Sequence, residues 1–171
     1  MKKLTGEIME FADSIVIALV AVMVVFTLFF RIYVVTGDSM QSTLDSGDRL
    51  LVSQLFYTPK QGDIVCFVAK NRNEKVLVKR VVATAGQTVD ITDDFRVMID
   101  GEILEEAYLD DGIYTSPKNF KFPYTVQEDE VFCLGDNRVN SADSRDLGPI
   151  ETKYLLGRLV LRLFPRPGTV N

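Results

Sequence analysis

The chain has 171 residues and a formal net charge of −5, from 24 acidic and 19 basic residues spread without a basic block. Phosphate binding needs a concentrated cationic surface, so this charge balance argues against nucleic acid as a partner. The sequence contains no histidine and only two cysteines, which argues against a zinc site and excludes a Ser-His-Asp triad. We therefore expect no metal ion and no other cofactor, and one domain of ordinary size.

An uncharged apolar run follows a polar N-terminal segment of 13 residues. No residue from Ser14 to Phe30 is charged, and beyond Arg31 the apolar run continues to Val35. This length predicts a membrane-spanning helix over residues 14–34, with Arg31 reaching the interface. A cleavable signal peptide would end in small residues, which this run lacks, so we predict a retained anchor. Positive charges on its two sides are nearly balanced, and charge alone does not fix its orientation.

After the apolar run the pattern becomes that of short strands divided by turn residues. The strand-like runs are residues 49–52, 64–68, 75–83, 89–91, 97–99, 102–104, 130–134 and 154–164. Asp100-Gly101 lies between two of them and suits a type I′ turn, which predicts a tight hairpin. Strands of this length and spacing predict an all-β fold, with an antiparallel sheet or a barrel-like core.

Two segments interrupt this pattern. Residues 105–128 are rich in acidic, aromatic and proline residues, and we expect an irregular excursion there. Leu55-Phe56-Tyr57 is an apolar triplet in a loop between two predicted strands. Its side chains either fold back into the core or dip into a lipid interface, and the sequence supports both interpretations.

The two cysteines, Cys66 and Cys133, each lie inside an apolar run. One interpretation is a disulfide in an extracytoplasmic domain. The other is a pair of buried thiols that behave as small apolar side chains. We favour buried thiols, because neither cysteine lies in a loop that needs a cross-link.

Ser39 and Lys79 are the candidate catalytic pair. Ser39 follows the turn-forming Gly37-Asp38, a few residues beyond the predicted anchor. Lys79 lies in a predicted strand on the face that also carries Leu77 and Val81. Desolvation on such an apolar face lowers the pKa of a lysine, and the neutral amine can take a proton from a serine hydroxyl. The alternative is a lysine that protects an edge strand from pairing.

A third stretch, residues 135–145, is a polar loop that follows a predicted strand. It contains hydroxyls, carboxylates and guanidiniums that could orient a lysine and support a catalytic site. The alternative is a solvated loop held by its own turns.

The three stretches together resemble bacterial type I signal peptidases, the membrane-bound serine proteases that remove signal peptides. Their motifs occur here in family order, and the resemblance covers nearly the whole chain. The matching segments are Ser39-Met40-x-x-Thr43-Leu44, Gly62-Asp63-Ile64-Val65, Lys79-Arg80-Val81-Val82 and Gly135-Asp136-Asn137-Arg138-x-Asn140-Ser141-x-Asp143-Ser144-Arg145.

The resemblance implies roles for five residues. Ser39 would be the acylating nucleophile and Lys79 the general base. Ser141 would hydrogen-bond to Lys79 and orient it. Asp143 and Arg145 would form a structural ion pair beneath the site.

The resemblance also implies the substrate. Secretory preproteins would be cleaved after small side chains at the first and third positions before the cut. The walls of the pockets for these side chains would be Val35, Met40, Leu44 and Val78.

The resemblance further implies the topology. A single span would lie in the cell membrane, in contact with the lipid bilayer, with residues 1–13 cytoplasmic and the catalytic domain extracellular. The β core would comprise residues 35–88 and 129–171, and residues 89–128 would form a reduced cap.

Two positions depart from the family pattern. Ser42 stands where the family usually has proline, which predicts a less rigid turn after the nucleophile. Gly37 stands where some members have a serine that helps to bind the oxyanion. The backbone N–H of Ser39 is then one donor, and the second donor is unassigned.

Two other functions compete with a signal peptidase. The self-cleaving SOS repressors also use serine and lysine on a β fold, but they need a DNA-binding domain where this chain has an anchor. An inert, membrane-tethered β domain that binds exported proteins would not need Ser39, Lys79 and Ser141.

Overall fold

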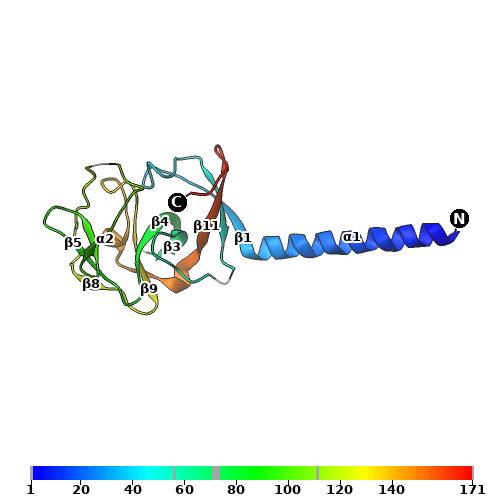
Figure 1. Ribbon diagram of the computed structural model, residues 1–171, viewed down its shortest axis with the longest axis horizontal. Coiled ribbons are helices and arrows are strands. Elements are labelled where there is room, and N and C mark those ends of the chain that lie inside the picture. Colours follow the sequence, from blue (N-terminus) through cyan, green and yellow to red (C-terminus); the bar gives the residue numbers. More distant parts are fainter. Residues whose placement is uncertain (1, 56, 71–73, 111, 171) are drawn as a thin grey trace.

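The structure is a computed structural model that describes residues 2–170 except 56, 71–73 and 111. A long helix, α1 (Lys2–Phe29), projects from a β domain (Figure 1). Its segment Met9–Phe29 is long and apolar enough to cross a membrane, and none of that segment is buried against the domain.

The apolar run divides into a helix and a strand, so the predicted helix over residues 14–34 is wrong at its end. Strand β1 (Phe30–Val34) begins directly after α1 and pairs antiparallel with β2 (Arg49–Ser53). Residues 30–34 are aromatic and β-branched apart from Arg31, which favours a strand wherever a partner edge is available. An apolar run does not distinguish these two structures by hydropathy alone.

The main sheet has seven antiparallel strands in the order β1-β2-β11-β3-β4-β9-β10. Its other strands are β3 (Ile64–Ala69), β4 (Lys75–Thr84), β9 (Glu130–Leu134), β10 (Ile150–Glu151) and β11 (Leu155–Phe164). The predicted all-β antiparallel fold is confirmed. Strand β4 lies between β3 and β9, so the interpretation of Lys79 as a guard of an edge strand is wrong.

A second, four-stranded sheet lies at the end of the domain opposite α1 (Figure 1). Its strands, in order, are β7 (Glu102–Ile103), β6 (Val97–Ile99), β5 (Thr88–Ile91) and β8 (Tyr124–Thr125). Asp100 and Gly101 both have positive φ, at 53° and 87°, as a type I′ turn requires. The predicted hairpin between β6 and β7 is confirmed.

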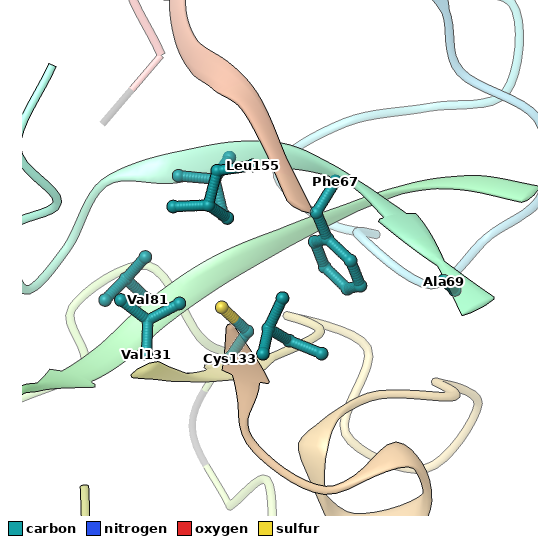
Figure 2. Close-up of a cluster of buried hydrophobic side chains, with 8 residues drawn as sticks. Phe67, Ala69, Val81, Val131, Cys133 and Leu155 are labelled. Carbon is teal, nitrogen blue, oxygen red and sulfur yellow. The ribbon is translucent and has the colours of Figure 1, made fainter. Parts of the chain in front are cut away.

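The core occupies both faces of the main sheet, because β3 is buried on both sides. Figure 2 shows one face, where Phe67, Val81, Val131, Cys133 and Leu155 converge between the strands. The opposite cluster combines the turn after β1 with β2 and β3, and its members are Val35, Met40, Leu44, Leu50, Val52, Ile64 and Cys66.

Cys66 and Cys133 belong to clusters on different faces, and both are buried free thiols. The buried-thiol interpretation therefore holds. Burial raises the pKa of Cys66 to about 12, so this thiol stays protonated and unreactive.

The described residues of the apolar triplet at 55–57 lie in different environments. Tyr57 packs against the cluster of Figure 2 and donates a hydrogen bond from its hydroxyl to Asp63, at 2.9 Å. Leu55 is exposed, and Phe56 lies outside the described residues. Tyr57 therefore folds back toward the core.

Candidate active site

The turn that carries Ser39 is anchored by apolar side chains. Met40 and Leu44 are fully buried, and the N–H of Leu44 donates to the carbonyl of Met40 at 2.8 Å. The N–H of Val35 donates to the carbonyl of Asp48 at 2.9 Å and closes the loop. This packing fixes the backbone around Ser39 and leaves this residue half-buried.

Lys79 is buried, with 1% of its surface exposed. Its Nζ lies 2.6 Å from Ser39 Oγ and 2.7 Å from the carbonyl oxygen of Val78. Forty residues of sequence separate the serine and the lysine, so the sheet brings together the pair that the sequence predicts.

The loop after β9 closes the site from the other side. The backbone N–H of Asn137 donates to the carbonyl of Ser39 at 3.1 Å, and its side-chain amide donates to the carbonyl of Asp38 at 3.0 Å. A Cβ atom added to Gly135 would lie 2.4 Å from the Ser39 carbonyl oxygen. Only glycine permits so close an approach of the two backbones.

Ser141 lies in the site but does not make the predicted contact. Its Oγ is buried and has no hydrogen-bond partner among the described residues, so the expected hydrogen bond to Lys79 is not formed. The amine of Lys79 instead donates to Ser39 Oγ and to the carbonyl of Val78. Ser141 Oγ lies against Gly135, where an added Cβ atom would be only 2.1 Å away.

Asp143 and Arg145 form a fully buried ion pair, with Nη2 and Oδ2 2.7 Å apart. Burial alone would raise the pKa of Asp143, but the hydrogen bond and charge of Arg145 outweigh this and lower it. Asp143 also accepts from the N–H of Gly135 at 3.1 Å and caps the short helix α2 (Ser144–Leu147). The pair therefore fixes the backbone that packs against Ser39.

A second buried ion pair joins β4 to the same loop. Arg80 Nη2 lies 2.8 Å from Asp136 Oδ2, and Thr43 Oγ1 donates to this carboxylate at 2.5 Å. The remaining guanidinium nitrogen of Arg80 donates to the carbonyl of Gly62 at 3.0 Å. Arg80 and Asp136 lie in the motifs that match the family, but the sequence predicts no role for either residue. The position of Arg80 next to Lys79 was the available signal.

The four predicted wall residues lie in one place. Val35, Met40 and Leu44 belong to the same buried cluster, and Val78 packs against it.

The loop of residues 135–145 is not a solvated loop, because its charged side chains at 136, 138, 143 and 145 are buried. Among the described residues, no group of three or more His, Cys, Asp and Glu side chains is arranged to hold a metal ion.

Replacing Arg145 with methionine should lower the free energy of unfolding by about 3–5 kcal/mol at neutral pH, because Asp143 would stay buried without a counter-charge. The pKa of Asp143 is lowered in the folded protein, so its stabilising effect is complete above the ordinary carboxyl pKa of about 3.9. It is lost as the pH falls through the lower folded value. Tyrosine fluorescence of the full chain in detergent micelles, followed through denaturant unfolding, measures this difference.

The difference between wild type and Arg145→Met should therefore shrink in acid. Lys153→Met is the control, since its ion pair with Glu151 is exposed and should leave the unfolding curve unchanged. A difference that stayed constant from neutral pH into strong acid would contradict the assigned role of the ion pair.

The chain is similar to known signal peptidases over most of its length. A family model described as "Signal peptidase, peptidase S26" matches residues 8–164. Signal peptidase I of Leptolyngbya laminosa is 33% identical over 174 residues, which covers 95% of this chain and 83% of the relative. Signal peptidase I P of Bacillus subtilis subsp. natto is 34% identical over 174 residues, which covers 96% and 93%.

The structural comparison agrees with the sequence relatives. The crystal structure of a signal peptidase I from Enterococcus faecalis superposes with a TM-score of 0.50 at 30% sequence identity. The match covers 61% of this chain and 98% of that chain. Both the sequence and the fold therefore show that the chain belongs to the signal peptidase family of S26 peptidases.

Proposed function

We propose that this signal-peptide-cleaving peptidase is a membrane-bound serine endopeptidase, with Ser39 as its nucleophile and Lys79 as its general base. The observation that carries the proposal is the 2.6 Å separation of Lys79 Nζ and Ser39 Oγ, with the lysine buried. The sequence contains no histidine, so the base must be another group. A merely tethered binding domain would have no need of such a pair.

The chemistry follows from this pair. The neutral amine of Lys79 takes the proton of the Ser39 hydroxyl as Oγ attacks the scissile carbonyl carbon. The resulting ammonium gives that proton to the amine that leaves when the peptide C–N bond breaks. Lys79 then takes a proton from a water molecule, whose oxygen attacks the acyl-enzyme ester. The ester C–O bond breaks, and Lys79 gives this proton to the leaving Ser39 Oγ, which restores the hydroxyl and the neutral amine. The backbone N–H of Ser39 is the oxyanion donor that we assign.

The apolar cluster beside Ser39 supports the expected substrate preference. Val35, Met40 and Leu44 belong to one buried apolar cluster, and Val78 packs against it. Walls of this kind favour small apolar side chains of an extended peptide over large or charged ones. We infer that secretory preproteins with small residues at the first and third positions before the cut are the substrates.

Helix α1 supports anchoring in the cell membrane. Its segment Met9–Phe29 has 21 residues, about the number that spans a bilayer. We infer a single span, with the N-terminus cytoplasmic and the β domain extracellular, because exported preproteins emerge on that side. Ser39 then lies ten residues beyond the end of the helix.

Alanine at Ser39 or at Lys79 should each reduce preprotein cleavage by the full-length protein in detergent to background. The two groups act as one unit, so the double variant should be little worse than either single one. Lys75→Ala is the matched control, since Lys75 is an exposed lysine on the same strand, and it should cleave normally. If Lys79→Ala kept about a tenth of the wild-type turnover, Lys79 would not be the base.

Cleavage should accelerate as the pH rises, because only the neutral form of the Lys79 amine accepts a proton. Burial removes the water that stabilises an ammonium, so the midpoint should lie well below the value of about 10.4 of a free lysine. A profile of kcat/KM against pH measures the midpoint. A midpoint near the free-lysine value would mean that burial does not tune this amine.

Gly135→Ala should lower kcat by about a hundredfold, because the added Cβ would displace the backbone of Ser39 from the lysine. The added Cβ would meet the side chain of Ser141 and the carbonyl oxygen of Ser39, and the carbonyl belongs to the main chain, so it cannot rotate away as a flexible side chain would. Gly168→Ala is the control, since nothing lies within 4 Å of its added Cβ. Equal kcat values for Gly135→Ala and the wild type would show that this close approach does not position Ser39.

A further inference from the structure

The irregular segment between β7 and β8 reaches into the catalytic end of the main sheet. Glu106, on this segment, forms a bidentate ion pair with Arg138 of the loop after β9. Thr115, on the same segment, accepts a hydrogen bond from Arg138 Nη1 at 2.6 Å. The side chain of Arg138 is fully buried by these contacts, so the segment completes the interior of the site.

Tyr108 covers the other buried arginine. Its ring lies over the guanidinium of Arg80, with 3.7 Å between Cζ and the ring centre. Its hydroxyl donates to Glu106 Oε1 at 2.6 Å. Burial first, and then the adjacent Glu106, raise the pKa of Tyr108 well above its usual range, so it remains a neutral donor. One aromatic side chain thus contacts both Arg80 and the partner of Arg138.

Arg138 is tied to the backbone that holds the nucleophile. Its Nε donates to the carbonyl of Gly135 at 3.1 Å, and its own carbonyl accepts from Arg145 Nη2 at 2.9 Å. Burial opposes the charge of Arg138, but the hydrogen bonds and charge of Glu106 outweigh it and raise the pKa. The position of Gly135, against the Ser39 carbonyl, therefore depends on a guanidinium that Glu106 neutralises.

Arg80 is tied to the base and to the serine turn. It follows Lys79 on β4, and its ion pair with Asp136 includes the hydroxyl of Thr43 from the turn of Ser39. Arg80, Arg138, Asp136 and Glu106 form what we call the arginine network, with two positive and two negative charges. Without Glu106 the arginine network would hold an uncompensated positive charge in a buried place.

We propose that Glu106 and Tyr108 are positioning residues for the Ser39–Lys79 pair, acting through the arginine network. Glu106 fixes Arg138 and so the Gly135 backbone behind Ser39. Tyr108 keeps water from the face of Arg80 and so preserves the Arg80–Asp136–Thr43 contacts. This inference rests on the proposed function, and it makes Glu106 and Tyr108 part of the apparatus that positions the catalytic pair.

A role in stability alone predicts a different result. It would lower the melting temperature of variants but leave kcat of the folded molecules unchanged. A positioning role lowers kcat of folded molecules and leaves KM nearly unchanged, because it acts on the reacting groups and not on the binding of substrate. The two roles therefore separate when kcat and KM are measured below the lowest melting temperature of the set.

The test uses full-length protein in detergent micelles, with a purified preprotein as substrate and circular dichroism to count folded molecules. Tyr108→Leu and Glu106→Gln should each lower kcat about tenfold, with KM within about twofold of wild type. Tyr108→Phe keeps the ring over Arg80 and should retain more than about half of wild-type kcat. The controls are Tyr114→Leu and Glu105→Gln, whose side chains lie on the same segment but are exposed, and both should match wild type.

The proposal would be overturned if folded Tyr108→Leu and Glu106→Gln had the wild-type kcat and differed from the wild type only in a lower melting temperature. Should Glu106→Gln not fold, the comparison of Tyr108→Leu with Tyr108→Phe decides alone, because these variants keep every charge of the arginine network. Ser39→Ala is measured in parallel. If Ser39→Ala cleaved at the wild-type rate, the proposed function would fail; if it were inactive while the segment variants were normal, only the positioning role would fail.

Discussion

Three guanidinium groups are buried beneath Ser39 and Lys79, and the structure around the site depends on neutralising them. Each is paired with one carboxylate: Arg80 with Asp136, Arg138 with Glu106, and Arg145 with Asp143. A guanidinium or carboxylate that is buried without a partner costs several kcal/mol. Moving apart two segments that share an ion pair would leave such a charge, and is therefore unfavourable. Strand β4, the loop after β9 and the segment between β7 and β8 are therefore held as one unit. Lys79, the proposed general base, lies on the strand that enters this unit.

Much of the fold could be predicted from local patterns. Apolar runs and turn residues located β2, β3, β4, β9 and β11 of the main sheet, because a strand buried on one or both faces leaves a clear pattern in the sequence. They did not locate β1 or the two-residue β10. Asp100-Gly101 located a hairpin for the same kind of local reason. Ser39 and Lys79 could be proposed because the absence of histidine leaves few bases, and because their motifs occur in family order.

Contacts between residues that are far apart in the sequence could not be predicted from such local patterns. Glu106 and Tyr108 lie in a segment whose acidic composition looks like that of a solvated loop, and no local pattern marks them as partners of buried arginines. The charges of the motifs did carry a signal. The motifs contain three arginines, Arg80, Arg138 and Arg145, but supply only Asp136 and Asp143 to these ion pairs, so the third carboxylate had to come from elsewhere in the chain. The hydrogen bond expected between Ser141 and Lys79 was a wrong prediction for a related reason, because the direction of a hydroxyl depends on packing that no motif specifies. Residues 30–34 form a strand and not the predicted helix, because the edge of β2 is available to pair with them.

The junction of α1 and β1 has a mechanical consequence. Strand β1 begins at the residue after the helix ends and is hydrogen-bonded to β2 at once, so no flexible tether separates the two. In a bilayer, any tilt of the helix would be transmitted to the sheet and would change the height of Ser39 above the lipid. Helix tilt responds to the thickness of the hydrocarbon layer. With Ser39 as the proposed nucleophile, membrane thickness would then help to set which part of an emerging chain reaches the serine.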